Sequence, residues 1–533
     1  MISFHGTTIL TLLFLFAMVS TPAESDENPG DMPANAQVLT LKNALARGIE
    51  RNLDLQVEAI NIPIHRDQVV IDDSAFDSTV EGSMYTQEER TPTASSLAQG
   101  GLNITRTIGG STAIRKKFTF GLESSLSLET SRSENNSRND TLRPQYRDIL
   151  LLNLTQPLLR DFGTKINTVN RTISQNQVEQ AVHGYLDKAQ RIGEEIETVY
   201  FDLAEAASIL QSRIQSQDFA RELLQGNREK LNAGVVPISE VQQAETALAS
   251  RNEQVISAQQ QLEIVTQRLK DLLEIRSGDP LYAVFFVTQE MTATEQTHPN
   301  LENALETAYQ KRPDLKQQDL AIAAWKLRLE YYRNQKLPRI DLVGTFGVNG
   351  LSGQERPSVD IGSTSTQPNR YVGDYFDAFP NMIEAQGMEW YIGVKVSYPL
   401  GNRAALARLH QADREKIQAI LKRKRLEGAV ETEVKNALAV VERSWERVQV
   451  ARQFEELAAV TLEQETARLQ EGLTDTFHIL KYQDDVVESR IRKTTAMADY
   501  HQGLAHLHRA MGTNLERYDI EADYENQESL HER

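Results

Sequence analysis

Apolar residues recur at alternating steps of three and four positions over stretches much longer than an ordinary helix. From Val241 to Leu272 they form a coiled-coil seam that is interrupted only by Arg251. The segment before it, residues 171–234, contains no proline, and about 64 residues of helix extend roughly 95 Å. Gly234 and Pro237 stand where one helix should end and the next begin. The pattern predicts two long helices folded back at a tight turn.

In other regions the period of the apolar residues changes to two, which is typical of β-strands. Alternating segments occur at residues 76–84, 118–128 and 150–154, and again at residues 340–348 and 390–398. Residues 102–108 are a further candidate. Each segment has one apolar and one polar face, as the strands of membrane barrels do, although soluble sheets alternate in the same way.

The last alternating segment carries the clearest membrane signal. Its apolar face contains Ile392, Val394 and Val396, with Trp390 and Tyr398 at its two ends. Aromatic residues that bracket an apolar strand face are typical of the interfacial girdles of membrane barrels. We therefore predict that these three aliphatic side chains face lipid.

The same order of elements occurs twice along the chain. Residues 301–305 match residues 41–45 closely, and each half reads as short helix, strands, long helix, tight turn and short helix. Gly472 occupies the second turn, and Thr474 after it is suited to cap the returning helix. We expect a first repeat at 41–276, a linker at 277–300 and a second repeat at 301–513.

The ends of the chain differ from the repeats. Residues 1–23 contain a short apolar run and a small-residue cleavage site, which predicts a secretory signal peptide. An acidic, flexible leader is expected at 24–40 and an acidic, mobile tail at 514–533. Because no later run of 18 apolar residues exists, we expect entry into a membrane only as a closed β-barrel.

Composition excludes several functions. The formal net charge of −18 argues against nucleic acid as a partner, and the absence of cysteine excludes disulfides and thiolate chemistry. No phosphate-binding loop or catalytic motif stands out. His501, His506 and His508 lack the spacing of metal ligands. We expect no enzyme activity, no cofactor and no metal.

Four short motifs, together with the repeat, carry a family resemblance. Residues 154–158 and 397–400 mark the strand-to-helix junctions, and residues 230–241 and 468–479 mark the two turns. Their order and spacing resemble the TolC-like outer-membrane efflux proteins (outer-membrane factors). The resemblance implies an α+β membrane protein in which a long antiparallel coiled-coil helical barrel continues a transmembrane β-barrel. Trimerisation would close both, with about four strands per protomer and about 12 in total.

The resemblance also implies a location and partners. The homotrimer would lie in outer-membrane lipid, extend into the periplasm, and contact a periplasmic adaptor and an inner-membrane transporter. We therefore expect a passive exit duct for efflux or type I secretion. A periplasmic adaptor and a structural coiled-coil envelope protein are the alternatives, and the cargo stays open among drugs, metal ions and proteins.

Two sets of candidate site residues follow from this interpretation. The residues expected to contact the adaptor are Gly234, Ser239, Gly472 and Thr474. In well-known relatives, aspartates after the second turn line the closed end of the tunnel. The matching positions here are His478 and Lys481, and Asp484 and Asp485 follow one turn later. These four residues are the candidate tunnel constriction.

Overall fold

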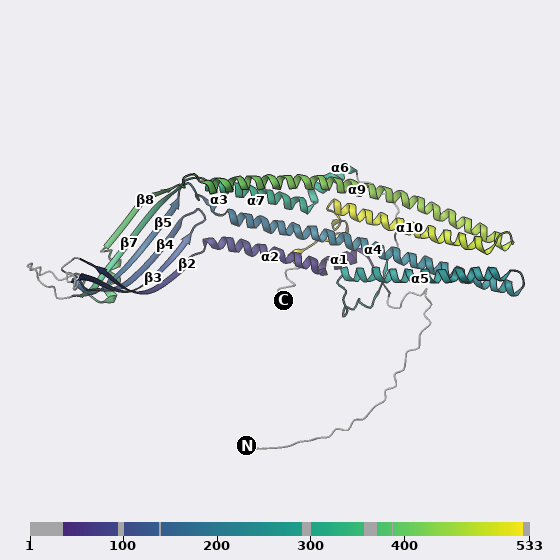
Figure 1. The fold of residues 1–533 in the computed structure, drawn as a ribbon, viewed down its shortest axis with the longest axis horizontal. Helices are drawn as coiled ribbons and strands as arrows, with labels where there is room; N and C mark the ends of the chain where they lie inside the picture. Colours follow the sequence, from purple (N-terminus) through teal and green to yellow (C-terminus); the bar gives the residue numbers. More distant parts are fainter. Residues whose placement is uncertain are drawn as a thin grey trace, which may run out of the picture.

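The protein is a long, thin molecule with a β-sheet at one end and two helical hairpins at the other (Figure 1). The structure is a computed structural model, and it describes residues 36–93, 101–137, 140–289, 291, 300–355, 370–385 and 387–525. The expected signal peptide and most of the expected leader lie outside these residues.

Two very long helices run along the molecule. Helix α4 (Val169–Asn232) has 64 residues and α9 (Arg403–Gln470) has 68. Each is paired over one half by a returning helix of 35 residues, α5 (Ile238–Leu272) or α10 (Thr476–Ala510). Over the other half, α2 (Leu53–Asp73) packs on α4 and α7 (Pro313–Gln335) packs on α9. Two short helices therefore follow one another along each long one.

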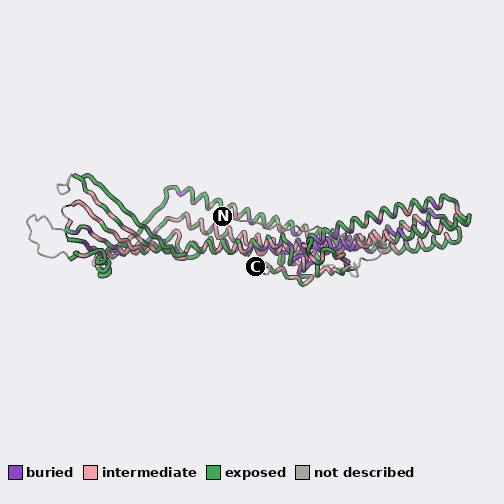
Figure 2. The backbone as a smooth tube through the Cα atoms, turned by 90° about the horizontal axis from the view of Figure 1, so that it is seen from below, coloured by how far each residue is buried: buried purple, intermediate pink, exposed green. Residues whose placement is uncertain are grey.

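The helices form a wall that is one layer thick. Near the sheet, α2 contacts α4, α4 contacts α7, and α7 contacts α9. Near the hairpin ends α4 contacts α5 and α10, and α10 contacts α9. Buried residues concentrate at mid-length (Figure 2), where α1 (Leu41–Arg51) and α6 (Leu301–Lys311) add material around the long helices. Toward both ends the helices are much more exposed, because no second layer covers them.

All strands of the main sheet are antiparallel neighbours. The sheet contains β2 (Thr79–Pro92), β3 (Leu102–Lys117), β4 (Glu123–Asn135), β5 (Leu142–Pro157), β7 (Arg339–Glu355) and β8 (Gly387–Ser397), in that order. The expectation of about four strands is wrong, because the described chain contributes six to one sheet.

The expectation of four strands came from the family resemblance, whereas the alternating segments include a candidate for each of the six strands. One of these segments, residues 118–128, contains a turn, because β3 ends at Lys117 and β4 begins at Glu123. Phe118 donates its amide hydrogen to the carbonyl of Leu122, and Gly121 adopts a φ of +99°. The segment thus folds into a hairpin that runs the length of the sheet.

The described part of the C-terminal tail is packed against the helices. Leu515 is 7% exposed, and Asn514 donates a hydrogen bond to the carbonyl of Gln190 at 2.7 Å. The 3-10 helix η4 (Glu516–Tyr518) follows. Residues 514–525 therefore do not form the mobile tail that their acidity suggested, because Leu515 and Tyr518 pack on the core around α4.

Smaller elements connect the main ones. The expected linker contributes β6 (Phe285–Thr288), which pairs in parallel with β1 (Ala36–Leu39) of the leader. At the strand-to-helix junctions lie η1 (Ser74–Phe76) and α3 (Thr164–Asn167). Between β7 and β8 lie η3 (Tyr375–Asp377) and α8 (Ala378–Ile383). In the described part of the chain, none of the helices combines the length and the apolar character needed to cross a bilayer.

Candidate functional site: sheet faces, hairpin tips and the contact between the hairpins

One face of the six-stranded sheet is apolar and exposed. The predicted lipid-facing residues Ile392, Val394 and Val396 are 70%, 62% and 64% exposed and lie on this face. The strand register places the following side chains on the same face: Val80, Met84, Ile108, Ile114, Leu126, Leu128, Leu150, Leu152, Ile340, Leu342, Phe346, Val348, Met388 and Trp390. A continuous apolar surface of this kind suits contact with lipid.

The opposite face of the sheet is mainly polar. Ser83 and Ser111 share a hydrogen bond between their hydroxyls at 2.8 Å, and Arg115 forms an ion pair with Glu81 at 2.8 Å. Tyr85 donates its hydroxyl hydrogen to Glu129 at 3.0 Å. The sheet therefore separates an apolar side from a side that suits water.

The two hairpin turns have almost identical backbone geometry. Gly234 and Gly472 have φ values of +73° and +72°, and a Cβ at either position would meet nothing within 4 Å. After each glycine, the next amide bonds back to the last helical turn, from Val235 to the carbonyl of Lys230 and from Leu473 to that of Arg468. These bonds are the Schellman arrangement, which requires a left-handed residue.

The predicted contact residues beside the glycines differ in exposure. Ser239 is exposed, whereas Thr474 is only half-exposed. The prediction that Thr474 caps the returning helix is wrong, because Asp475 is the N-cap and accepts the amide hydrogen of His478 at 3.0 Å. That bond is the largest of the causes that hold the pKa of Asp475 below its usual value.

The candidate constriction residues differ in their hydrogen-bond and ion-pair partners. His478 bonds through Nδ1 to Asp475 at 2.6 Å, and Lys481 is exposed. Among the described residues, Lys481 has no ion-pair partner. Asp484 instead points to the other hairpin, where its carboxylate accepts a 3.0 Å bond from Arg251 of α5. Asp485 is half-buried, and like Lys481 it has no ion-pair partner among the described residues, so these are the two constriction candidates with uncompensated charges.

Arg251 connects the two hairpins, although the periodicity of the sequence indicated it only as a break in the seam. It is 3% exposed and donates to the carbonyl of Ser216, to Gln483 at 3.1 Å and to Asp484. A buried guanidinium is stable only when its donors are satisfied. The break in the apolar pattern was the available signal, although Gln483 and Asp484 lie more than 200 positions away.

Further polar contacts join the two hairpins. Thr476 bonds to Asn227 at 3.0 Å, and Arg490 bonds to Gln215 at 2.8 Å. Nearer the middle, Thr495 donates to Glu205 and Gln502 donates to Asp202. Within one hairpin, by contrast, Leu224, Val241 and Ala244 form an apolar cluster. Apolar contacts therefore stabilise the hairpin of α4 and α5, and side-chain hydrogen bonds join the two hairpins to each other.

The side chains of His501, His506 and His508, near the C-terminal end of α10, have different partners. His501 stacks on Phe201 with the ring centroids 4.7 Å apart, His506 pairs with Glu194, and His508 bonds to Thr513. Their side chains therefore do not converge on one point.

A buried carboxyl lies at mid-length. Glu197 of α4 is 1% exposed, and Tyr518 donates to its Oε2 at 3.0 Å. Burial raises the pKa of Glu197 to about 7, although the bond from Tyr518 acts in the opposite direction. Its charge therefore depends on pH near neutrality.

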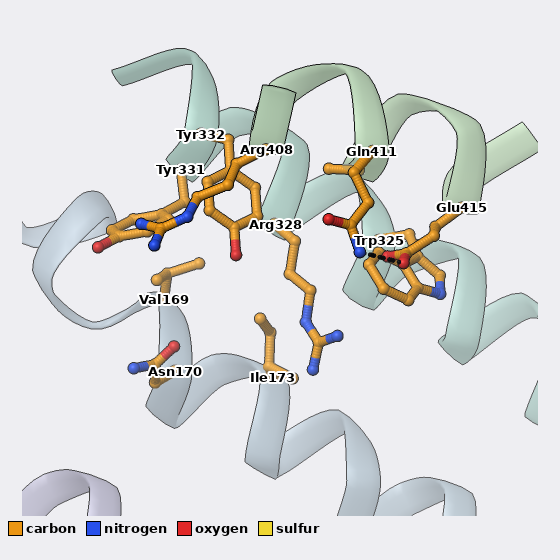
Figure 3. A pocket seen from close by; sticks show the side chains of 11 residues that line it. Val169, Asn170, Ile173, Trp325, Arg328, Tyr331, Tyr332, Arg408, Gln411 and Glu415 are labelled. Atoms are coloured by element: carbon orange, nitrogen blue, oxygen red, sulfur yellow. Dashed lines mark hydrogen bonds between the residues drawn. The ribbon is translucent and has the colours of Figure 1, made fainter. Parts of the chain in front are cut away.

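A cavity of about 390 Å³ lies between α4, α7 and α9 near the sheet (Figure 3). Aromatic and basic residues of α7 line it, with the Arg328 guanidinium 4.6 Å from the Trp325 ring centroid. Figure 3 shows Arg408 of α9 beside Tyr331 and Val169 of α4 below them. This composition suits the packing of neighbouring helices and contains no nucleophile with an adjacent base.

Comparisons with known proteins agree with this arrangement. Residues 304–513 match the model of the family described as outer membrane efflux protein. No curated protein matches the sequence.

Several solved outer-membrane channels have a similar fold. The Campylobacter jejuni CmeC outer membrane channel is 16% identical with a TM-score of 0.62, over 92% of this chain and 88% of that one. The Vibrio cholerae outer membrane protein VceC is 12% identical with a TM-score of 0.59, over 89% and 96%. The Neisseria gonorrhoeae MtrE outer membrane channel is 15% identical with a TM-score of 0.57, over 89% of both chains.

Proposed function

We propose that this chain, a member of the outer membrane efflux protein family, is the exit duct of a tripartite efflux or type I secretion system. It is a passive channel and not an enzyme, and it lies in the outer membrane and extends into the periplasm. Transport through it is driven by its partners.

The observation that carries this proposal is that both edges of the molecule lack partners. Strands β2 and β8 form the two edges of the sheet in the described chain. Edge strands expose unpaired backbone groups, and a membrane permits no such edge within its hydrocarbon layer. Association of identical copies in a ring satisfies every edge with the opposite edge of its neighbour.

The helical wall has matching unpartnered edges. Helix α2, next to β2, exposes a stripe consisting of Val57, Ile60, Ile64 and Ile71. Helix α9, next to β8, exposes Leu406, Ile417, Ile420 and Leu421. In a ring these two stripes meet, so the same association closes both the sheet and the wall. The family resemblance supports three copies.

The two tips are the proposed contact with a periplasmic adaptor, which links the duct to an inner-membrane transporter. Gly234 and Gly472 hold exposed turns at the end farthest from the sheet (Figure 1). Ser239 and Thr474 provide hydroxyls beside them. At the opposite end Ile392, Val394 and Val396 would contact lipid.

The constriction is proposed to lie just above the second tip. Threefold symmetry brings three copies of α10 around one axis, with His478 and Lys481 on them. Asp485 lies one helical turn further on, while Asp484 is held by Arg251. The entrance would then be less cation-selective than one lined by aspartates.

Fractionation of cells that express the protein tests the proposal. We expect a heat-resistant trimer in the outer membrane and co-purification of an adaptor with it. A soluble periplasmic monomer would instead favour the adaptor or the structural coiled-coil protein and would overturn the duct.

A further inference from the structure

We propose that the hairpin β3–β4 is part of the membrane-spanning wall, so that three copies close a barrel of 18 strands from the six that each contributes. This inference rests on the proposed trimeric duct. Barrel diameter grows roughly linearly with strand number, so such a barrel is about 1.5 times as wide as one of 12 strands. The hairpin is the part of the sheet that the resemblance did not lead us to expect.

The hairpin is paired along its whole length. β3 pairs with β2 from Thr79–Arg115 to Pro92–Leu102. β4 pairs with β5 from Glu123–Thr155 to Ser133–Gln145. A loop that merely covered the outer end would not make backbone ladders down to the ends of the neighbouring strands. The hairpin therefore lies between β2 and β5 as wall.

The apolar face continues through the hairpin without a break. One row of directly paired residues crosses all six strands: Val80, Ile114, Leu126, Leu152, Phe346 and Trp390. On this face β3 carries no charge between Arg106 and Lys116, and β4 carries none before Arg132. Charges that appear only at the two ends of a strand face match a lipid-facing band.

The inner turn of the hairpin is attached where the helices begin. The carbonyl of Phe120 accepts the amide hydrogen of Gly163 at 3.2 Å, directly before α3. A Cβ on Gly121 would lie 2.7 Å from the carbonyl oxygen of Asp161, so the approach is close. Lys116 lies over the Phe118 ring at 5.6 Å. Aromatic and basic residues at this level suit the membrane interface.

The topology permits closure with the extra strands. The sheet has an even number of strands, and each strand is antiparallel to its neighbour, so β2 and β8 run in opposite directions. The β2 edge of one copy can therefore pair antiparallel with the β8 edge of a second copy. β2 and β5 also run antiparallel, so a chain without β3–β4 could still join them directly.

The number of helices at the junction is unchanged by the hairpin. Only α2, α4, α7 and α9 continue from the sheet in the described chain. An 18-stranded barrel would thus continue into a helical tunnel whose width the hairpin does not change. Bulky cargo would meet its size limit in the helical part, and external solutes would reach the junction freely.

Cysteine labelling tests the placement of the hairpin, because the chain has no native cysteine. Leu126→Cys and Ser127→Cys are neighbours on β4 with side chains on opposite faces. Val394→Cys and Lys395→Cys are the matched pair on β8. In intact outer membranes we expect a water-soluble maleimide to label positions 127 and 395 at least tenfold faster than positions 126 and 394. Equal labelling of 126 and 127, with a strong difference between 394 and 395, would place the hairpin in water and overturn the inference.

Electron cryo-microscopy of the native protein in lipid nanodiscs provides the second readout. Eighteen strands are expected in the trimer, and 12 in a variant whose residues 93–139 are replaced by a short glycine–asparagine loop. A native trimer with 12 strands would overturn the inference and leave the duct intact. A native protein that forms no membrane trimer would overturn both.

Discussion

The strands at one end of the molecule and the helical hairpins at the other end are held together by different kinds of bonds. At the sheet end, continuous backbone ladders connect six strands, and a one-residue slip would turn every apolar side chain to the wrong face. At the tip end, two hairpins with apolar seams touch each other through side chains such as Arg251 and Asp484. Backbone ladders open only by unfolding, whereas a few side-chain bonds exchange readily with water. We therefore expect the two hairpins to separate more easily than the strands of the sheet.

A charge on the apolar sheet face should have the largest effect. Val394→Lys is expected to cost about 2–4 kcal/mol near the bilayer midplane and to prevent most assembly, as measured by trimer yield on unheated gels. Ser397→Lys, on the polar face at the strand end, is the control and should be milder. Equal tolerance of both would show that the strand faces are assigned incorrectly.

Glu197 lies between the two ends and should make stability depend on pH. Its pKa in the folded protein is about 7, above the ordinary glutamate value, so folding favours the protonated form. Stability is therefore unaffected at pH 4, falls as pH rises from about 4.5 to 7, and stays reduced above that.

Glu197→Gln imitates the protonated form and should stabilise the protein at pH 8 by up to about 3 kcal/mol of unfolding free energy. The melting temperature should therefore rise at pH 8 and change little at pH 4.5. Glu195→Gln, on the exposed side of α4, is the control. A gain for Glu197→Gln that is the same at both pH values would contradict the assignment.

Arg251→Met should loosen the tips without disturbing the sheet. It leaves Asp484, Gln483 and the Ser216 carbonyl without their donor, at a cost of about 2 kcal/mol. Disulfide trapping between Gln215→Cys and Arg490→Cys should fall several-fold, while trimer yield stays normal.

Arg221→Met is the matched control, because Arg221 is exposed and pairs within its own helix. If trapping is equally efficient in both variants, Arg251 does not hold the hairpins together.

Gly472→Val should act at one turn only. A φ of +72° costs a branched residue about 1–2 kcal/mol, so the turn should distort and transport should fall while trimer yield stays near normal. Gly428→Val is the control, because this position lies in the middle of α9 and a Cβ there would meet nothing within 4 Å. Loss of trimer in parallel with loss of transport would make the turn purely structural.

The smallest effect is expected at the proposed constriction. The ammonium groups of Lys481 repel cations, so Lys481→Asp should raise cation selectivity, as measured by single-channel reversal potentials. Strong native cation selectivity that this substitution does not change would remove Lys481 from the constriction.

Local rules in the sequence determined most elements of this protein. A left-handed residue ends each long helix at Gly234 and Gly472, and a three-and-four apolar step runs along the seam of α5. Alternation located β5, β7 and β8 and the face of Ile392, Val394 and Val396. These features depend on neighbours within a few positions, so the sequence alone contains them.

The tertiary structure decided what depends on distant partners. Alternation continues through the turn at 118–122, and only the pairing of β3 with β2 and of β4 with β5 makes β3 and β4 a hairpin within one six-stranded sheet. In the sequence Arg251 only interrupts a seam, whereas in the structure Asp484 of the other repeat accepts its hydrogen bond. The acidic C-terminal segment becomes ordered because Leu515 and Tyr518 find the core around α4. The apolar period and the backbone preferences depend on residues a few positions apart. Strand register and burial instead depend on contacts between segments that only the fold brings together.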